Sequence, residues 1–153
     1  MGSELDGVVK ELFALAGVDP AASRGPAEMV PSLFGDRVLR TSRERSASVR
    51  RSRGRRQLLL APDLKGAPLE RALSIAFADW WIDARGLDFD RELLASAILV
   101  PSPQLAIICG PCGLSIEEAA KFFSTTPEII EWRIRDVCSP DRSGVFFAMK
   151  ETG

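Results

Sequence analysis

The feature that most constrains the fold is an apolar helical pattern in the middle of the chain, between Pro68 and Asp83. Apolar residues recur there three and four positions apart on one side of a helix, and a second apolar set covers another side. The two sets are Leu69, Ala72, Leu73, Ala76, Phe77 and Trp80, and Ile75, Ala78 and Ile82. A helix that is apolar over most of its circumference is usually buried. We therefore expect a central helix over 68–83, with Pro68 in its first turn.

Further helices are expected on both sides of this central helix. Residues 5–16 place apolar side chains on one helical face, and Gly17 suits the end of that helix. Residues 26–34 form a shorter helical segment whose middle is weakened by Pro31. The remaining helical segments are expected at 88–100, 105–109, 116–123 and 127–137.

The last two of these segments look like a helix-turn-helix pair. Ser115 and Glu118 have the spacing of a capping box, and Pro127 fits the first turn of the second helix. That second helix carries Glu128, Glu131 and Asp136 against Arg133 and Arg135, a net charge of −1. Recognition helices usually need a neutral or positive face near the phosphates, so we favour a structural or protein-contact role over direct reading of DNA.

Between residues 37 and 60 the pattern changes to short strand-like pieces. They lie at 37–40, 47–50 and 57–60, and Gly54 suits a hairpin turn. We expect a small three-stranded antiparallel sheet, with a disordered basic loop as the alternative because 41–56 holds few apolar residues. The fold class is therefore α+β: a mostly helical single domain over 1–153 with a small sheet.

Composition and termini exclude several classes of protein. The chain has 153 residues, of which 46% are apolar and 27% charged, as in ordinary globular domains. No apolar run approaches the ~18–20 residues that span a bilayer, and the acidic start lacks the apolar region of a signal peptide. Three cysteines, an odd number, fit a reducing compartment. We expect a cytoplasmic protein that does not associate with a membrane.

The chain contains no histidine. This absence excludes a Ser-His-Asp triad, a Cys-His pair and any metal site that uses imidazole ligands. We therefore expect no metal and no cofactor.

Positive charge is concentrated in the segment Arg37–Arg56. It contains nine arginines and one acid, Glu44, for a local net charge of +8. Because the whole chain carries −1, the remainder carries −9. Arginine suits phosphate and carboxylate recognition, so this segment is the candidate binding surface for an acidic partner or nucleic acid. The partner-binding residues that we single out are Arg50, Arg51, Arg53, Arg55 and Arg56.

The order of the expected elements, together with three short motifs, resembles the ImmA/IrrE family of zinc peptidases. The strand Gln57–Leu60 with the following 61–64 is similar to the family's strand before the metal helix. Leu94–Pro101 is similar to its Phe-Ala-x-x-Leu-Leu-Met-Pro motif, and Glu118–Thr126 to the start of its final helix pair. The resemblance covers about residues 5–137. It implies a zincin-like architecture with a peptidase-like core over 5–100, a helix pair over 101–138 and a tail over 139–153.

The family's metal motif, Ala-His-Glu-Leu-Gly-His, falls on residues that cannot hold zinc. By the resemblance, Phe77 stands for the first histidine, Ala78 for the general-base glutamate and Trp81 for the second histidine, with Asp90 near the third ligand. None of the first three can bind a metal or activate water. We expect Phe77 and Trp81 to fill the former cleft. The alternative is that they are core residues of an unrelated helical domain.

Cysteines form one further candidate site. Cys109-Gly110-Pro111-Cys112 spells a thioredoxin-type redox tetrapeptide, but the flanking sequence does not fit the strand and helix that activate such a thiol. Zinc held by Cys109, Cys112 and Cys138 would need an acidic fourth ligand, which is unusual for structural zinc.

Active relatives in the family cleave helix-turn-helix repressors in phage, mobile-element and stress circuits. The resemblance therefore implies a pseudoenzyme, a non-catalytic peptidase-like regulator that binds a protein partner such as a transcriptional repressor. The first alternative is a nucleic-acid-binding module that uses Arg37–Arg56. The second is a thiol-disulfide protein that uses Cys109 and Cys112. The oligomeric state does not follow from the sequence.

Overall fold

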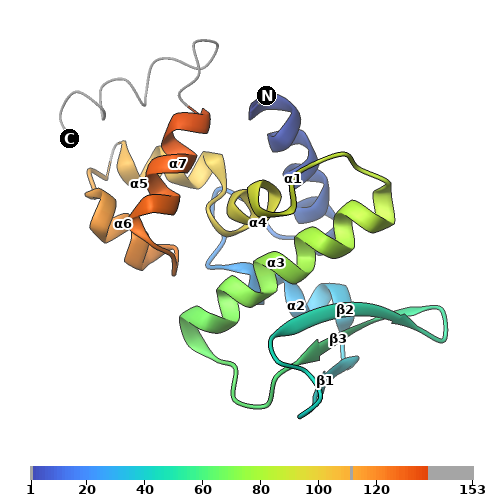
Figure 1. Ribbon diagram of the computed structural model, residues 1–153. Helices are drawn as coiled ribbons and strands as arrows, with labels where there is room; N and C mark the ends of the chain where they lie inside the picture. The colour runs from blue at the N-terminus through green and yellow to red at the C-terminus, as the bar shows by residue number, and fades with distance from the viewer. Residues whose placement is uncertain (1, 111, 138–153) are drawn as a thin grey trace.

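A computed structural model of the chain describes residues 2–110 and 112–137. The described residues are mostly helical with a small three-stranded sheet, which confirms the α+β class (Figure 1). The elements, in chain order, are α1 (Gly2–Ala16), the 3₁₀ helix η1 (Pro26–Met29), α2 (Val30–Phe34), β1 (Val38–Arg40), β2 (Ala47–Ser52), β3 (Arg55–Leu60), α3 (Gly66–Arg85), α4 (Arg91–Leu99), α5 (Ser102–Cys109), α6 (Ile116–Phe122) and α7 (Pro127–Val137).

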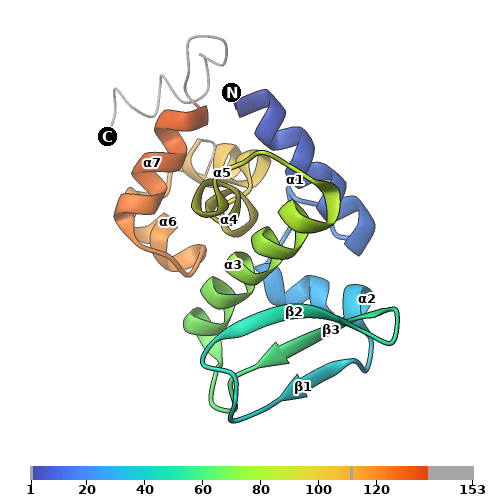
Figure 2. The ribbon, with the colours of Figure 1, turned by 45° about the vertical axis from the view of Figure 1, so that its right-hand side comes forward.

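Helix α3 is the central element, as the apolar pattern predicts. It crosses the middle of the molecule, with the sheet on one side and helices α1 and α4 on the other (Figures 1 and 2). Phe77 and Ala78 on this helix have no exposed surface. Gly86 ends the helix in the left-handed region at φ 60° and donates its backbone N–H to the Ile82 carbonyl. The helix extends two residues beyond the expected range at each end.

The expectation of an all-antiparallel sheet is wrong for the first strand. The strand order is β1-β3-β2, and β3 in the middle pairs with β2 in the antiparallel sense, from Ala47 opposite Leu60 to Ser52 opposite Arg55. β1 pairs with β3 in the parallel sense and ends with Arg40 opposite Leu60. The sheet is therefore mixed, and the segment 37–60 forms ordered strands rather than a disordered loop.

The central position of β3 explains the parallel pairing of β1. β3 is the most buried strand, since its Leu58 and Leu60 are buried and neither of the other strands has a buried residue. The segment 41–46 passes the carboxyl end of β3, where Thr41 N–H donates to the Leu60 carbonyl at 2.9 Å and Ala61 N–H donates to the Ser46 carbonyl at 2.8 Å. Because the chain crosses that end to reach the far side of β3, β1 must run parallel to β3.

Two apolar clusters divide the described chain near the end of α4. The larger cluster joins α1, α2, β3, α3 and most of α4, and it includes Phe13, Phe34 and Phe77. The smaller cluster begins at Leu99 and joins α5, α6 and α7.

The C-terminal helices form as the capping signals predict. The Ser115 hydroxyl accepts from the Glu118 N–H at 3.1 Å, and the Glu118 carboxylate accepts from the Ser115 N–H at 2.9 Å. On α7, Arg133 is 1% exposed, and its guanidinium donates to the Val100 carbonyl, the Ser102 hydroxyl and the Asp136 carboxylate. This arginine therefore ties α7 to the α4–α5 junction.

A candidate binding groove

The three positions that correspond to the metal motif lie in the core. Phe77 and Ala78 are 0% exposed and Trp81 is 3% exposed. Phe77 stacks on Phe34 with ring centroids 5.9 Å apart. The Trp81 indole N–H is buried and has no hydrogen-bond partner in the part of the chain that the structure describes. Phe77 and Trp81, one helical turn apart, thus share the buried face of α3.

Asp90, the expected neighbour of the third-ligand position, caps a helix instead. Its carboxylate oxygen Oδ1 accepts from the backbone N–H of Glu92 at 2.8 Å and of Leu93 at 3.2 Å, at the start of α4. Among residues 2–110 and 112–137, no group of three or more cysteine or acidic side chains is placed to hold a metal ion.

The arginines of 37–56 divide into two sets. Four of them are held by hydrogen bonds. Arg37 Nε donates to the Arg56 carbonyl, Arg56 Nε donates to the Leu33 carbonyl, and Arg50 Nε donates to the Gln57 side chain. The fourth, Arg40, donates to three carbonyls after β3. The second set has no side-chain partner among the described residues and comprises Arg43, Arg45, Arg51, Arg53 and Arg55.

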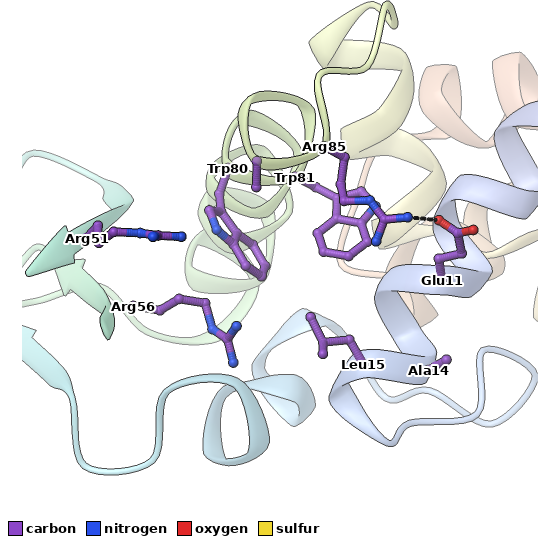
Figure 3. A pocket seen from close by; sticks show the side chains of 9 residues that line it. Glu11, Ala14, Leu15, Arg51, Arg56, Trp80, Trp81 and Arg85 are labelled. Carbon is purple, nitrogen blue, oxygen red and sulfur yellow. Dashed lines mark hydrogen bonds and ion pairs between the residues drawn. The ribbon is translucent and has the colours of Figure 1, made fainter. Parts of the chain in front are cut away.

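An open groove of about 480 Å³ lies where the basic sheet meets α3 and α1 (Figure 3). Its lining residues come from four elements that are distant in the sequence. They are Glu11, Ala14 and Leu15 of α1, Arg51 of β2, Arg56 of β3, and Trp80, Trp81, Ala84 and Arg85 of α3. The groove therefore combines three guanidinium groups and one carboxylate with an apolar floor.

Two adjacent tryptophan side chains in this groove each carry an arginine stacked on the ring. The Arg56 guanidinium lies 5.4 Å from the Trp80 ring centroid, the two indoles lie 5.4 Å apart, and the Arg85 guanidinium lies 4.9 Å from the Trp81 ring centroid. Figure 3 shows Arg51 reaching from its strand toward Trp80 as well. Stacking on an indole is favourable for a cation and restricts its rotamers, so the two rings hold Arg56 and Arg85 in place. We call this set the Arg–Trp ladder: Arg56, Trp80, Trp81 and Arg85.

Glu11 neutralises one end of the Arg–Trp ladder. Arg85 Nη2 and Glu11 Oε1 are 2.9 Å apart, and both side chains are about half exposed. An exposed pair of this kind contributes only about 0–1 kcal/mol to stability. A carboxylate from another molecule can therefore replace Glu11 at little cost.

A second hollow lies next to the groove, on the side of Arg51 and Arg56. It has a volume of about 260 Å³ and is lined by Arg37, Arg51, Gly54, Arg55 and Arg56. Arg51 and Arg56 line both spaces, so the hollow and the groove are neighbours. We call it the four-arginine hollow.

Three of the five arginines expected to bind a partner meet at these spaces: Arg51, Arg55 and Arg56. The other two do not line them. Arg50 lies on the opposite face of β2 from Arg51 and donates a hydrogen bond to the Gln57 side chain. Arg53 lies at the hairpin turn with φ 54°. Sequence reasoning missed Glu11, Trp80 and Arg85 as groove residues. Of these three residues, only Arg85 could have been suspected from the sequence, because it is a charged residue at the end of a largely apolar helix.

The two described cysteines differ in burial and in their position relative to helix α5. Cys109 is buried and ends helix α5, and burial raises the pKa of its thiol above the usual 9.0. The dipole at the amino end of a helix stabilises a thiolate, and Cys109 lies at the opposite end of its helix. Cys112 is exposed, and both thiols are free. Cys138, the third cysteine considered for zinc, lies outside the described residues.

Comparisons of the chain with protein-family models, with curated proteins and with solved structures found no match. Within the described residues, no single helix is long and apolar enough to cross a membrane. Helices α4 and α5 reach the length and apolar content of a membrane span only when taken together, and they are bent by 50° at their junction.

Proposed function

We propose that this protein is a non-catalytic binding module that holds an acidic segment of a partner protein in the groove along the Arg–Trp ladder. The observation that carries the proposal is the pair of guanidiniums stacked on adjacent indoles, Arg56 on Trp80 and Arg85 on Trp81. Arginine and tryptophan are the residue types that dominate the energetics of protein interfaces. Here they are combined in one groove.

Charge favours an acidic ligand. Arg51 has no hydrogen-bond or ion-pair partner among the described residues, and only Nε of Arg56 is occupied. Their free nitrogens can donate to carboxylates in the planar, paired geometry that arginine prefers. Because Glu11 already occupies Arg85, the ligand's own carboxylate would take the place that Glu11 fills in the free protein.

The groove floor favours a protein over a nucleic acid. Ala14, Leu15 and Ala84 offer apolar surface beside the indoles, which suits the side chains of a peptide. A nucleic acid would instead need a track of cations along several phosphates, and the chain outside 37–56 carries −9.

The helix pair α6–α7 also supports a protein-contact role. Arg133 is buried, so it does not contribute to the exposed surface of α7, on which Glu128 and Glu131 lie. An acidic exposed face repels DNA phosphates.

The resemblance to the ImmA/IrrE family completes the proposal. Phe77, Ala78 and Trp81 pack the centre of α3 and supply neither a metal ligand nor a general base. A cytoplasmic pseudo-peptidase of this kind would hold a regulatory partner, such as a phage or mobile-element repressor, without cutting it.

A labelled peptide of alternating Glu and Leu residues tests the proposal by fluorescence anisotropy. We expect binding that weakens as salt rises and that is reduced at least about fivefold by Arg51→Ala, the loss of one charge-assisted contact. The matched control is Arg45→Ala, which removes the same charge from an exposed site outside the groove. Equal weakening by the two substitutions would show that the peptide responds only to overall charge and would refute the groove as its site. Tighter binding of duplex DNA than of the peptide would favour the nucleic-acid alternative.

A further inference from the structure

We propose that the four-arginine hollow binds a phosphate monoester carried by the partner, so that recognition depends on phosphorylation of the bound segment. This inference rests on the proposed function, because it places the phosphate on the same protein segment that occupies the groove. It adds the chemical class of the ligand group and a means of regulation.

The hollow gathers positive charge without compensation. Four arginine residues line a space of about 260 Å³, and its lining includes no carboxylate. Like charges brought together in this way raise the free energy of the unliganded protein, and an anion in the hollow relieves that repulsion. The groove differs in this respect, since Glu11 already compensates Arg85.

Two of the four guanidiniums are oriented by the fold. Arg37 Nε donates to the Arg56 carbonyl at 2.8 Å, and Arg56 Nε donates to the Leu33 carbonyl at 3.1 Å. Each of the two side chains is thus held through its Nε, and Arg56 is held further by its stacking on Trp80. The terminal nitrogens of both have no partner among the described residues and remain available to a ligand.

The number of donors matches a phosphate better than a carboxylate. A phosphate monoester carries about −1.5 to −2 charges at neutral pH and three strong acceptor oxygens, whereas a carboxylate carries one charge and two oxygens. Several arginines around one anion are a recurring solution for recognising phosphorylated side chains. Here Arg51 and Arg55, which have no other described partner, can adapt to the group that Arg37 and Arg56 position.

The connection to the groove favours a phosphorylated protein over a nucleic acid. Arg51 and Arg56 line both spaces, so a segment whose phosphate lies in the hollow continues directly over Trp80 and the apolar floor. The hollow offers one local cluster of arginines, which suits a single phosphate, whereas nucleic-acid affinity comes from many phosphate contacts along the chain.

The test compares two forms of the Glu–Leu peptide on the full chain, with either serine or phosphoserine at the central position. We expect the phosphopeptide to bind at least about tenfold more tightly, as two charge-assisted hydrogen bonds would provide. Arg51→Ala/Arg55→Ala should reduce that ratio to about twofold or less. Arg43→Ala/Arg45→Ala removes the same charge from exposed positions outside the hollow and should preserve the ratio.

Each outcome separates the two proposals. Equal affinity for both peptides, with binding still dependent on Arg51, would overturn the phosphate site and leave the groove proposal standing. A ratio that falls equally in both double variants would also overturn the site, since overall charge would then account for it. If neither peptide binds, both proposals fail, and inorganic phosphate titrated at constant ionic strength would then show whether the hollow binds anions at all. Stronger competition by single-stranded DNA than by the phosphopeptide would reassign the hollow to nucleic acid.

Discussion

Truncating Phe77 to alanine tests whether the centre of α3 is a packed part of the core. Phe77 has no exposed surface and stacks on Phe34 at 5.9 Å, so Phe77→Ala removes the whole ring from a closed environment. Such truncations cost about 3–5 kcal/mol through lost burial and the cavity left behind. For a chain of this length, that corresponds to a fall in Tm of roughly 6–20 °C.

Urea denaturation followed by tryptophan emission measures this loss, and Ile75→Ala on the same helix is the matched control. Ile75 is 43% exposed, so its truncation should change the free energy of unfolding by no more than about 0.5 kcal/mol. A loss below about 1 kcal/mol for Phe77→Ala would show that the ring does not fill the centre of the domain. It would also remove the reason to regard this position as a filled cleft.

Three further predictions concern buried polar groups and thiols. Arg133→Ala should cost about 3–5 kcal/mol in urea melts, because it removes the buried donors to the Val100 carbonyl and the Ser102 hydroxyl and the cation paired with Asp136; a loss near zero would contradict its role in joining α7 to the rest of the chain. Cys112 should react with an alkylating reagent well before Cys109, since Cys109 is buried and its thiol pKa is raised; equal rates by mass spectrometry would refute this order. Burial raises the pKa of Glu70 above 4.5, so the folded state disfavours its charged form. The free energy of unfolding of the native protein, compared with that of Glu70→Gln, should therefore fall as pH rises from 4.5 toward neutrality. A difference between the two proteins that does not change with pH would contradict this prediction.

Local sequence signals predicted most of the helices. The apolar stripe of α3, the Ser115–Glu118 capping box and the Gly17 helix end each depend on residues within a few positions of one another. Such patterns specify secondary structure directly, because the periodicity and the caps act within one or two turns. The expected helix at 26–34 forms as η1 followed by α2, with the change of helix type just before Pro31.

The strand pairing and the groove depend on contacts that the sequence pattern does not encode locally. Three short strand-like pieces fit either a meander or the observed order, and the observed order places β3, the most buried strand, in the middle. The Arg85–Glu11 pair joins residues 74 positions apart. The basic segment was therefore visible from the sequence, but its meeting with Trp80 and Trp81 was not.

Indole N–H resonances provide the most direct test of the proposed binding site. The chain has three tryptophans, two in the Arg–Trp ladder and Trp132 on α7, so ¹⁵N-labelled protein should give three such signals, which Trp132→Phe would help to assign. On titration with the Glu–Leu peptide, we expect the Trp80 and Trp81 signals to move together while the Trp132 signal stays in place. Movement of the Trp132 signal alone, or of none of the three at saturating peptide, would place the binding surface elsewhere and contradict the proposed function.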